Sequence, residues 1–189
     1  LGIIMLALSL IVAATMPLRS STELAPLFLE ISHSPILAVL LGLCLGFGCF
    51  SSRAAVIITS GLVTAGVIPV STGLWVALGA DIESTILALM TTMTASRIGR
   101  RGPVANTMWR AVTLSFTALL LATCPFIAEG FGAIPDSIIY FHVTLNLIIS
   151  GTGLFIIKPF ARIADRIIPE KKADAKTGGE AADRFAQDN

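Results

Sequence analysis

Long stretches without a charged residue restrict the fold of this chain more than any other feature. The longest of these stretches cover residues 1–18, 34–52, 54–80, 111–128 and 138–157. A helix needs about 20 predominantly apolar residues to cross a bilayer, and within lipid a helix satisfies all of its own backbone polar groups. The pattern therefore predicts an all-α, multi-pass helical membrane protein surrounded by a lipid bilayer.

The composition narrows the possible functions. Hydrophobic residues make up 54% of the chain and charged residues 13%, with a formal net charge of +1. This balance argues against a disordered chain, a nucleic-acid-binding protein and an ordinary soluble enzyme. The sequence contains no Ser-His-Asp set, Gly-rich phosphate loop or metal-ligand spacing, so we expect no enzymatic activity, no organic cofactor and no structural metal site.

The segment over residues 34–69 is too irregular for a simple span. Two apolar arms of about 16 residues, each roughly 24 Å of helix, flank Ser51, Ser52 and Arg53. Each arm is short for a full crossing. We therefore predict a re-entrant hairpin with these three residues at its tip.

The next segment, residues 71–96, carries two acids near its centre, Asp81 and Glu83. Gly79 could end one half-helix, and Ser84 or Thr85 could cap a second one. A discontinuous helix is the structure we predict here. Such backbone is tolerated at membrane depth only where it lines a cavity or is buried in protein.

Charged groups at membrane depth are costly and are often functional. If the hairpin tip meets the helix break, Arg53 can pair with Asp81 or Glu83. That pair indicates either a substrate or ion site, or a salt bridge that braces two irregular segments. Arg110 lies about two turns from the basic residues that precede it, so we expect its side chain to reach back to the membrane surface.

Hydroxyl groups accompany both predicted helix starts, Ser51 and Ser52 at one and Ser84 and Thr85 at the other. Helix N-termini attract anions, so these groups could hold an oxyanion such as phosphate. Hydroxyls with unwound carbonyls could equally hold a sodium ion, and small polar residues also pack between membrane helices without a ligand.

His142 and Asn146 are four residues apart and share one face of the last apolar helix. They could line or gate a cavity, although an interhelical hydrogen bond is the interpretation that we favour.

The distribution of Lys and Arg predicts the orientation. Residues 95–103 and the tail after residue 157 are basic, whereas residues 129–136 carry two acids and no base. Basic segments stay inside, so we expect the first two on the cytoplasmic side of the inner (plasma) membrane. Residues 1–169 are then a membrane transport domain, and residues 170–189 a charged cytoplasmic linker or the truncated edge of a further domain.

The order of these segments resembles the bacterial sodium/phosphate cotransporter family, whose transport domain has two inverted repeats. Phe50-Ser51-Ser52-Arg53-Ala54 resembles the family's Gln-Ser-Ser-Ser-Ala hairpin tip, and Gly79-Ala80-Asp81-Ile82-Glu83-Ser84-Thr85 its Gly-Ala-Asn-Ile-Gly-Thr-Thr stretch. Phe141-His142-Val143-Thr144-Leu145-Asn146 is similar to the family's Phe-His-Thr-Leu-Phe-Asn helix, whereas Asn106-Thr107-Met108-Trp109-Arg110 matches its His-Leu-Leu-Phe-Asn helix poorly.

The resemblance implies one half of an inverted-repeat transporter, most similar to the second repeat. The chain begins with Leu1 and carries one tip motif, so we expect a piece of a longer protein. Its partners would be phosphate, the other repeat and a PhoU-like cytoplasmic domain, with sodium as the coupling ion.

Four positions depart from the family pattern: Phe50, Arg53, Asp81 and Glu83. Arg53 could replace a sodium ion while one acid carries a proton, or an Arg53–acid pair could plug the site. Two functions follow, a sodium-coupled phosphate transporter and a non-transporting membrane scaffold or phosphate sensor. A transporter of another anion is a third hypothesis.

Overall fold

The structure is a computed structural model that describes residues 23–168 continuously and, before them, positions 2, 6, 9, 10, 13, 14, 17 and 21. Most of the predicted helix over residues 1–18, and the tail over 170–189, lie outside the described residues. The described part is all helical, as predicted, and consists of α2 (Ala25–His33), α3 (Pro35–Cys49), α4 (Ser52–Thr64), α5 (Val70–Thr91), α6 (Arg97–Thr123), α7 (Pro125–Gly132) and α8 (Ser137–Ile167).

Three helices in this part are long and apolar enough to cross a membrane. They are Val70–Thr91, Gly99–Thr123 and Ser137–Ile167. The pair Pro26–His33 and Pro35–Cys49 meets the same criteria jointly but is bent by 113°. The prediction of a helical membrane protein is consistent with this arrangement.

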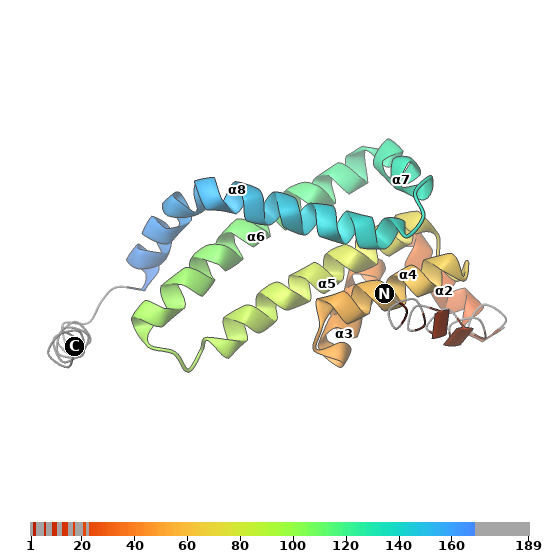
Figure 1. Cartoon of the computed structure of the whole chain (residues 1–189), viewed down its shortest axis with the longest axis horizontal. Helices are drawn as coiled ribbons and strands as arrows, with labels where there is room; N and C mark the ends of the chain where they lie inside the picture. The colour runs from red at the N-terminus through yellow and green to blue at the C-terminus, as the bar shows by residue number, and fades with distance from the viewer. Residues whose placement is uncertain are drawn as a thin grey trace, which may run out of the picture.

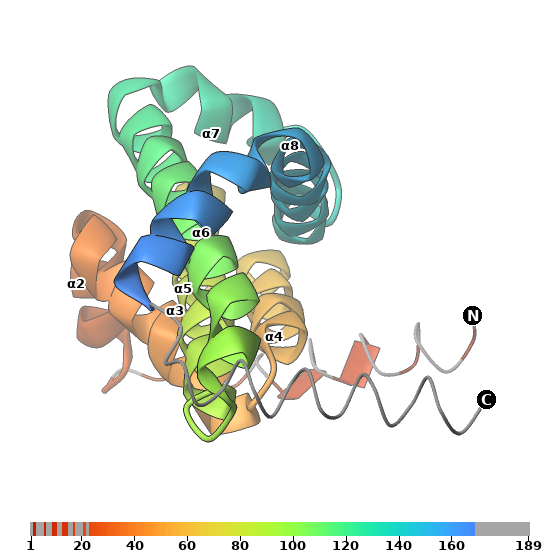
Figure 2. The same ribbon diagram turned by 90° about the vertical axis from the view of Figure 1, so that its left-hand side faces the viewer.

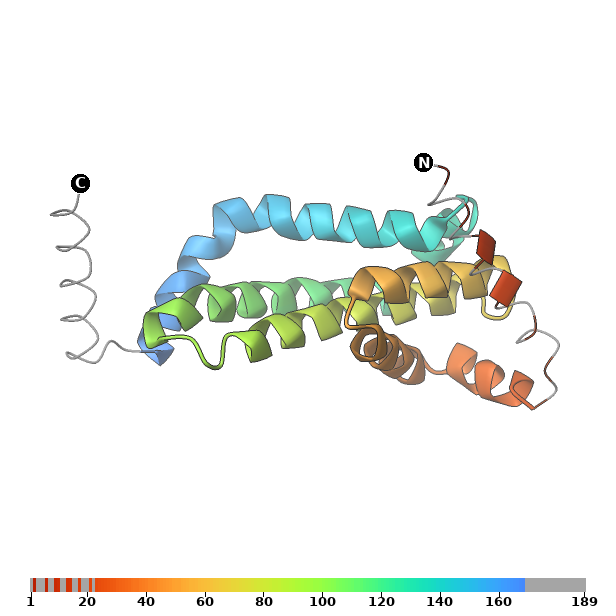
Figure 3. The ribbon, with the colours of Figure 1, turned by 60° about the horizontal axis from the view of Figure 1, so that its bottom comes forward.

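The core of the fold is α5, which lies between the α3–α4 hairpin and the α6–α8 pair (Figures 1 and 3). Leu74, Val76, Ala77 and Ala80 have no exposed surface. A helix that is apolar nearly all round is stable only when it is buried in this way.

Helix α3 approaches α5 so closely that the two backbones touch. A Cβ atom on Gly42 would lie 1.9 Å from the carbonyl oxygen of Val76, and one on Gly79 would lie 2.1 Å from that of Val39. Glycine is required at both positions because any side chain would separate the helices. Gly42 of α3 and Gly79 of α5 therefore permit the close packing of these two helices.

Helices α6 and α8 run alongside α5 and are joined at one end by α7 (Figures 1 and 2). The indole nitrogen of Trp109 donates a hydrogen bond of 2.9 Å to the carbonyl oxygen of Ile149. Near the other end of the pair, Arg101 forms an ion pair with Asp165, with 3.3 Å between Nε and Oδ1. These contacts fix α8 against α6 and so position the inner face of α8.

The predicted discontinuous helix is wrong, because α5 continues without a break from Val70 to Thr91. Asp81 and Glu83 are buried against protein, so no break is needed to keep them out of lipid. The hydroxyls of Ser84 and Thr85 donate to the carbonyl oxygen of Asp81, at 2.8 and 3.0 Å, instead of capping a new helix.

Most of the basic segment over residues 95–103 is helical. Ser96 caps α6, its hydroxyl accepting from the backbone N–H of Gly99 at 3.2 Å, so the helix already begins at Arg97. The acidic segment over residues 129–136 begins within α7.

Candidate functional site

The hairpin tip forms a sharp turn between α3 and α4. Phe50 adopts a left-handed conformation with φ of 49°, and Ser51 caps α4 by accepting a hydrogen bond of 3.3 Å from the backbone N–H of Ala54. Residues 50–53 line a cleft of about 390 Å³ together with Glu83 and Ser84 of α5. The hairpin tip and the acidic segment of α5 therefore adjoin, which was the condition for the expected Arg53–acid pair.

The carboxylate of Asp81 is buried and accepts from three side chains of α6 and α8. Its Oδ1 lies 3.4 Å from Nη2 of Arg110 and accepts a bond of 3.0 Å from Nδ2 of Asn146. Its Oδ2 lies 3.2 Å from Nδ1 of His142. This polar cluster joins three helices that are far apart in sequence.

The guanidinium of Arg110 completes the cluster. Its Nε donates to Oγ1 of Thr85 at 2.8 Å, and its Nη2 donates to Oγ of Ser84 at 3.3 Å. Its Nη1 donates to Oδ1 of Asn146 at 3.3 Å. A buried charge persists when it is paired and hydrogen-bonded in this way, so the fold holds Arg110 and Asp81 as a neutral unit.

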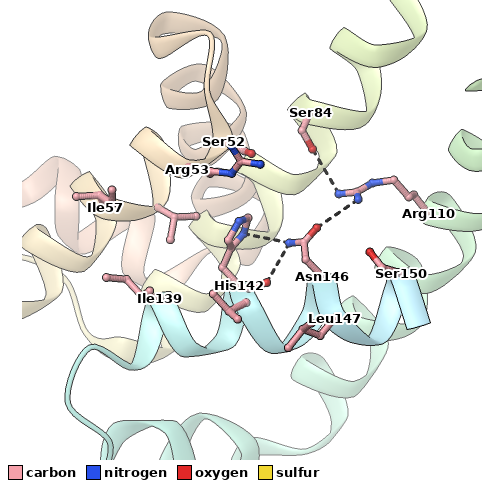
Figure 4. Close-up of a pocket in the computed structure, with 12 residues that line it drawn as sticks. Ser52, Arg53, Ile57, Ser84, Arg110, Ile139, His142, Asn146, Leu147 and Ser150 are labelled. Carbon is pink, nitrogen blue, oxygen red and sulfur yellow. Dashed lines mark hydrogen bonds between the residues drawn. The ribbon is translucent and has the colours of Figure 1, made fainter. Parts of the chain in front are cut away.

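A cavity of about 630 Å³ opens in front of this cluster (Figure 4). Its polar lining comes from α4, α5, α6 and α8 and consists of Ser52, Arg53, Ser84, Arg110, His142, Asn146 and Ser150. Apolar side chains such as Ile57, Ile139 and Leu147 form the rest of the wall. The cavity lining therefore offers hydrogen-bond donors and positive charge to a ligand, whereas Asp81, which pairs with Arg110, is not part of the lining.

The side chain of Arg53 is exposed and has no hydrogen bond or ion pair with any residue in the part of the chain that the structure describes. The expected Arg53–acid pair is therefore wrong. The partner of Asp81 is Arg110 instead, because Asp81 faces α6 and α8 rather than the hairpin tip. The expectation that Arg110 reaches back to the membrane surface is wrong for the same reason.

Glu83 lies outside this polar cluster. Successive helical residues are about 100° apart, so two positions beyond Asp81 the side chain points to the other side of α5. Glu83 lies against Gly46 of α3, and neither carboxylate oxygen has a hydrogen-bond partner among the described residues.

The structure brings the remaining sequence candidates to different places. His142 and Asn146 both line the cavity and bind α5, so the two interpretations of this pair coexist. Ser52 and Ser84 line the cavity, whereas Ser51 caps α4 and Thr85 supports Arg110. Ser150 and the role of Arg110 were not predicted from the sequence.

No group of three or more His, Cys, Asp or Glu side chains that could hold a metal ion occurs within residues 23–168 or the isolated positions before them.

Comparison with known proteins identifies relatives of this chain. The chain is 30% identical over 175 residues to the "Putative inorganic phosphate export protein YjbB" of Escherichia coli (strain K12), and 29% identical over 178 residues to the protein of that name in Salmonella typhimurium. Each comparison covers 90% of this chain, which spans 32% of the relatives' length. No solved structure matches the chain.

The match to a family model confirms the family resemblance noted in the sequence. The model of the Na+/Pi-cotransporter family matches residues 3–156, a range that includes the tip, the cavity and the Asp81 cluster. The chain therefore belongs to the Na+/Pi-cotransporter family.

Proposed function

We propose that this chain forms one half of the transport domain of a phosphate transporter and that phosphate binds in the cavity beside Arg53. Family membership and the name of the relatives support phosphate as the substrate. The proposal rests mainly on Arg53, whose positively charged side chain lines the cavity and has no partner among the described residues.

The polar groups around Arg53 suit a phosphate oxyanion. Ser52 and Ser84 supply hydroxyls, and Arg110 presents a second guanidinium at the cavity wall. Guanidinium groups recognise phosphate through paired, charge-assisted hydrogen bonds. Because Asp81 already neutralises Arg110, Arg53 supplies the net positive charge that attracts the anion.

The scaffold alternative required a plug between Arg53 and an acid. Arg53 forms no such pair within the described residues, which favours transport. We propose that transport is sodium-coupled and that the other repeat of the full-length protein completes the cavity, because inverted-repeat transporters bind substrate between repeats. A PhoU-like cytoplasmic domain after residue 169 is part of the same proposal.

The test is uptake of labelled phosphate by the full-length protein in sealed proteoliposomes, with sodium gradients of either direction. Arg53→Gln removes a charge-assisted contact of about 1.5–3 kcal/mol, so the half-saturating phosphate concentration should rise about ten- to a hundredfold. Arg162→Gln is the matched control, because Arg162 is exposed on α8 outside the cavity.

Two results would refute the proposal. One is an absence of phosphate flux under every gradient with the protein correctly inserted, which would favour the scaffold or sensor. The other is an unchanged half-saturating concentration in Arg53→Gln, which would remove the cavity as the binding site.

A further inference from the structure

The carboxylate of Glu83 is a buried acid that the phosphate site does not use. The residue has no exposed surface, and neither Oε1 nor Oε2 has a partner among the described residues. Such a group is expensive, since burying an unpaired carboxylate costs several kcal/mol. Ionisable residues inside a membrane domain commonly mark ion pathways.

The carboxylate of Glu83 and the hydroxyl groups near it favour a cation. On the α3 side Glu83 contacts Gly46, and at the tip the negative C-terminal end of α3 lies beside the positive N-terminal end of α4, so the helix dipoles favour neither sign of ion. Ser51, Ser52 and Ser84 line the same cleft. Carboxylate and hydroxyl oxygens are hard ligands, and hard cations take oxygen ligands.

The charged groups around this cleft are Arg53 and the neutral Asp81–Arg110 pair. Arg53 of α4 lines the cleft but forms no ion pair with Glu83. Asp81 and Arg110 compensate each other, with His142 of α8 on the far oxygen of Asp81. Of the two acids on α5, Glu83 alone is therefore left without a partner among the described residues.

We propose that Glu83 binds the monovalent cation, a proton or a sodium ion, whose gradient drives phosphate transport. The inference rests on the proposed transport function. The cation enters through the cleft at the hairpin tip, where its charge offsets that of the carboxylate. The cavity proposed for phosphate and the cleft at Glu83 share Ser52, Arg53 and Ser84 in their linings, so the two ligands occupy neighbouring places.

The test separates coupling from phosphate binding. Full-length wild type, Glu83→Gln and the control Glu129→Gln are reconstituted in proteoliposomes; Glu129 is exposed on α7. Phosphate counterflow, with equal sodium and pH on both sides, reports the phosphate site. Net accumulation under a sodium gradient or a pH gradient reports coupling and identifies the cation.

We expect Glu83→Gln to retain counterflow and to lose accumulation under whichever gradient drives the wild type. Glu129→Gln should retain both. Accumulation by Glu83→Gln at the wild-type level would overturn the inference, as would a wild type that shows counterflow but responds to neither gradient. A wild type without counterflow would refute the transport function itself.

A second variant applies where Glu83→Gln fails to insert. Glu83→Asp keeps the charge but shortens the side chain, so coupling should persist with a higher half-saturating concentration of the driving cation. An unchanged cation dependence in Glu83→Asp would overturn the inference.

Discussion

The Asp81–Arg110 pair should be the strongest polar link between α5 and α6. The atoms lie 3.4 Å apart, and the side chains are 1% and 14% exposed. At an effective dielectric constant of about 20, two unit charges at this distance attract by about 5 kcal/mol. Removing one partner leaves the other as an uncompensated buried charge, a loss of about 3–5 kcal/mol.

A double-mutant cycle measures this coupling. Asp81→Asn should lower the free energy of unfolding by about 3 kcal/mol or more, because Arg110 keeps its charge. Arg110→Met should cost less, since Asp81 retains His142 and Asn146. The double variant should resemble Arg110→Met, so the coupling energy should equal the cost of Asp81→Asn, about 3 kcal/mol or more. Denaturant unfolding of the full-length protein in detergent, followed by circular dichroism, gives these values.

The chain offers a matched control pair. Arg101 and Asp165 lie 3.3 Å apart, but their side chains are 23% and 52% exposed. Exposed pairs contribute about 0–1 kcal/mol, so the same cycle with Arg101→Met and Asp165→Asn should give a small coupling energy. The reasoning is refuted if Asp81→Asn and Arg110→Met add to within about 0.5 kcal/mol, or if both pairs couple equally.

Two further substitutions test the packing that positions the site. Gly42→Ala should force α3 away from α5 and cost about 1–3 kcal/mol of unfolding free energy. Gly48→Ala on the same helix has nothing within 4 Å of its Cβ position and should be neutral or stabilising. Equal thermal stability of the two variants in detergent would contradict this expectation. Trp109→Phe should cost about 1 kcal/mol or more in denaturant unfolding because it removes the bond to Ile149; the effect should exceed that of Trp75→Phe, whose indole nitrogen donates no hydrogen bond to a described residue.

The sequence predicted the elements whose signals are local. Uncharged length identified the helices, and the break at Ser51–Arg53 identified the hairpin tip. The meeting of that tip with the segment around Ser84 was stated only as a condition, and the structure brings the two together although α5 has no break. Orientation in the membrane and the re-entrant nature of the hairpin remain predictions.

The sequence could not show whether the helix breaks at Asp81 and Glu83, because the local pattern does not reveal whether a charged side chain is surrounded by protein or by lipid. The structure buries both acids, so the backbone hydrogen bonds of α5 continue. Gly79, which resembled a helix end, provides the contact with α3 instead.

The predicted position of the Arg110 side chain was wrong because it rested on the distance from the preceding basic residues alone. The direction in which the side chain leaves the helix was not considered. One available signal pointed to its position. In the poorly matching motif Asn106–Arg110, Arg110 stands where the family's helix ends in Asn, and Asn146 holds that place in the α8 motif. Both residues bind Asp81, so the poor match marked a changed site residue.

The charged residues of the site give a physical reason why phosphate would bind together with a cation. Arg53 and Arg110 are balanced by Asp81 and Glu83, so the residues around the two cavities carry no net charge when all four are ionised. Phosphate alone would add uncompensated negative charge at membrane depth, which is costly. A cation on Glu83 restores the balance, because it cancels the charge of that carboxylate and the charge of Arg53 then offsets that of the phosphate. Coupling between the two ligands is in this view electrostatic, and removing the charge of Glu83 should allow phosphate to exchange without its cation.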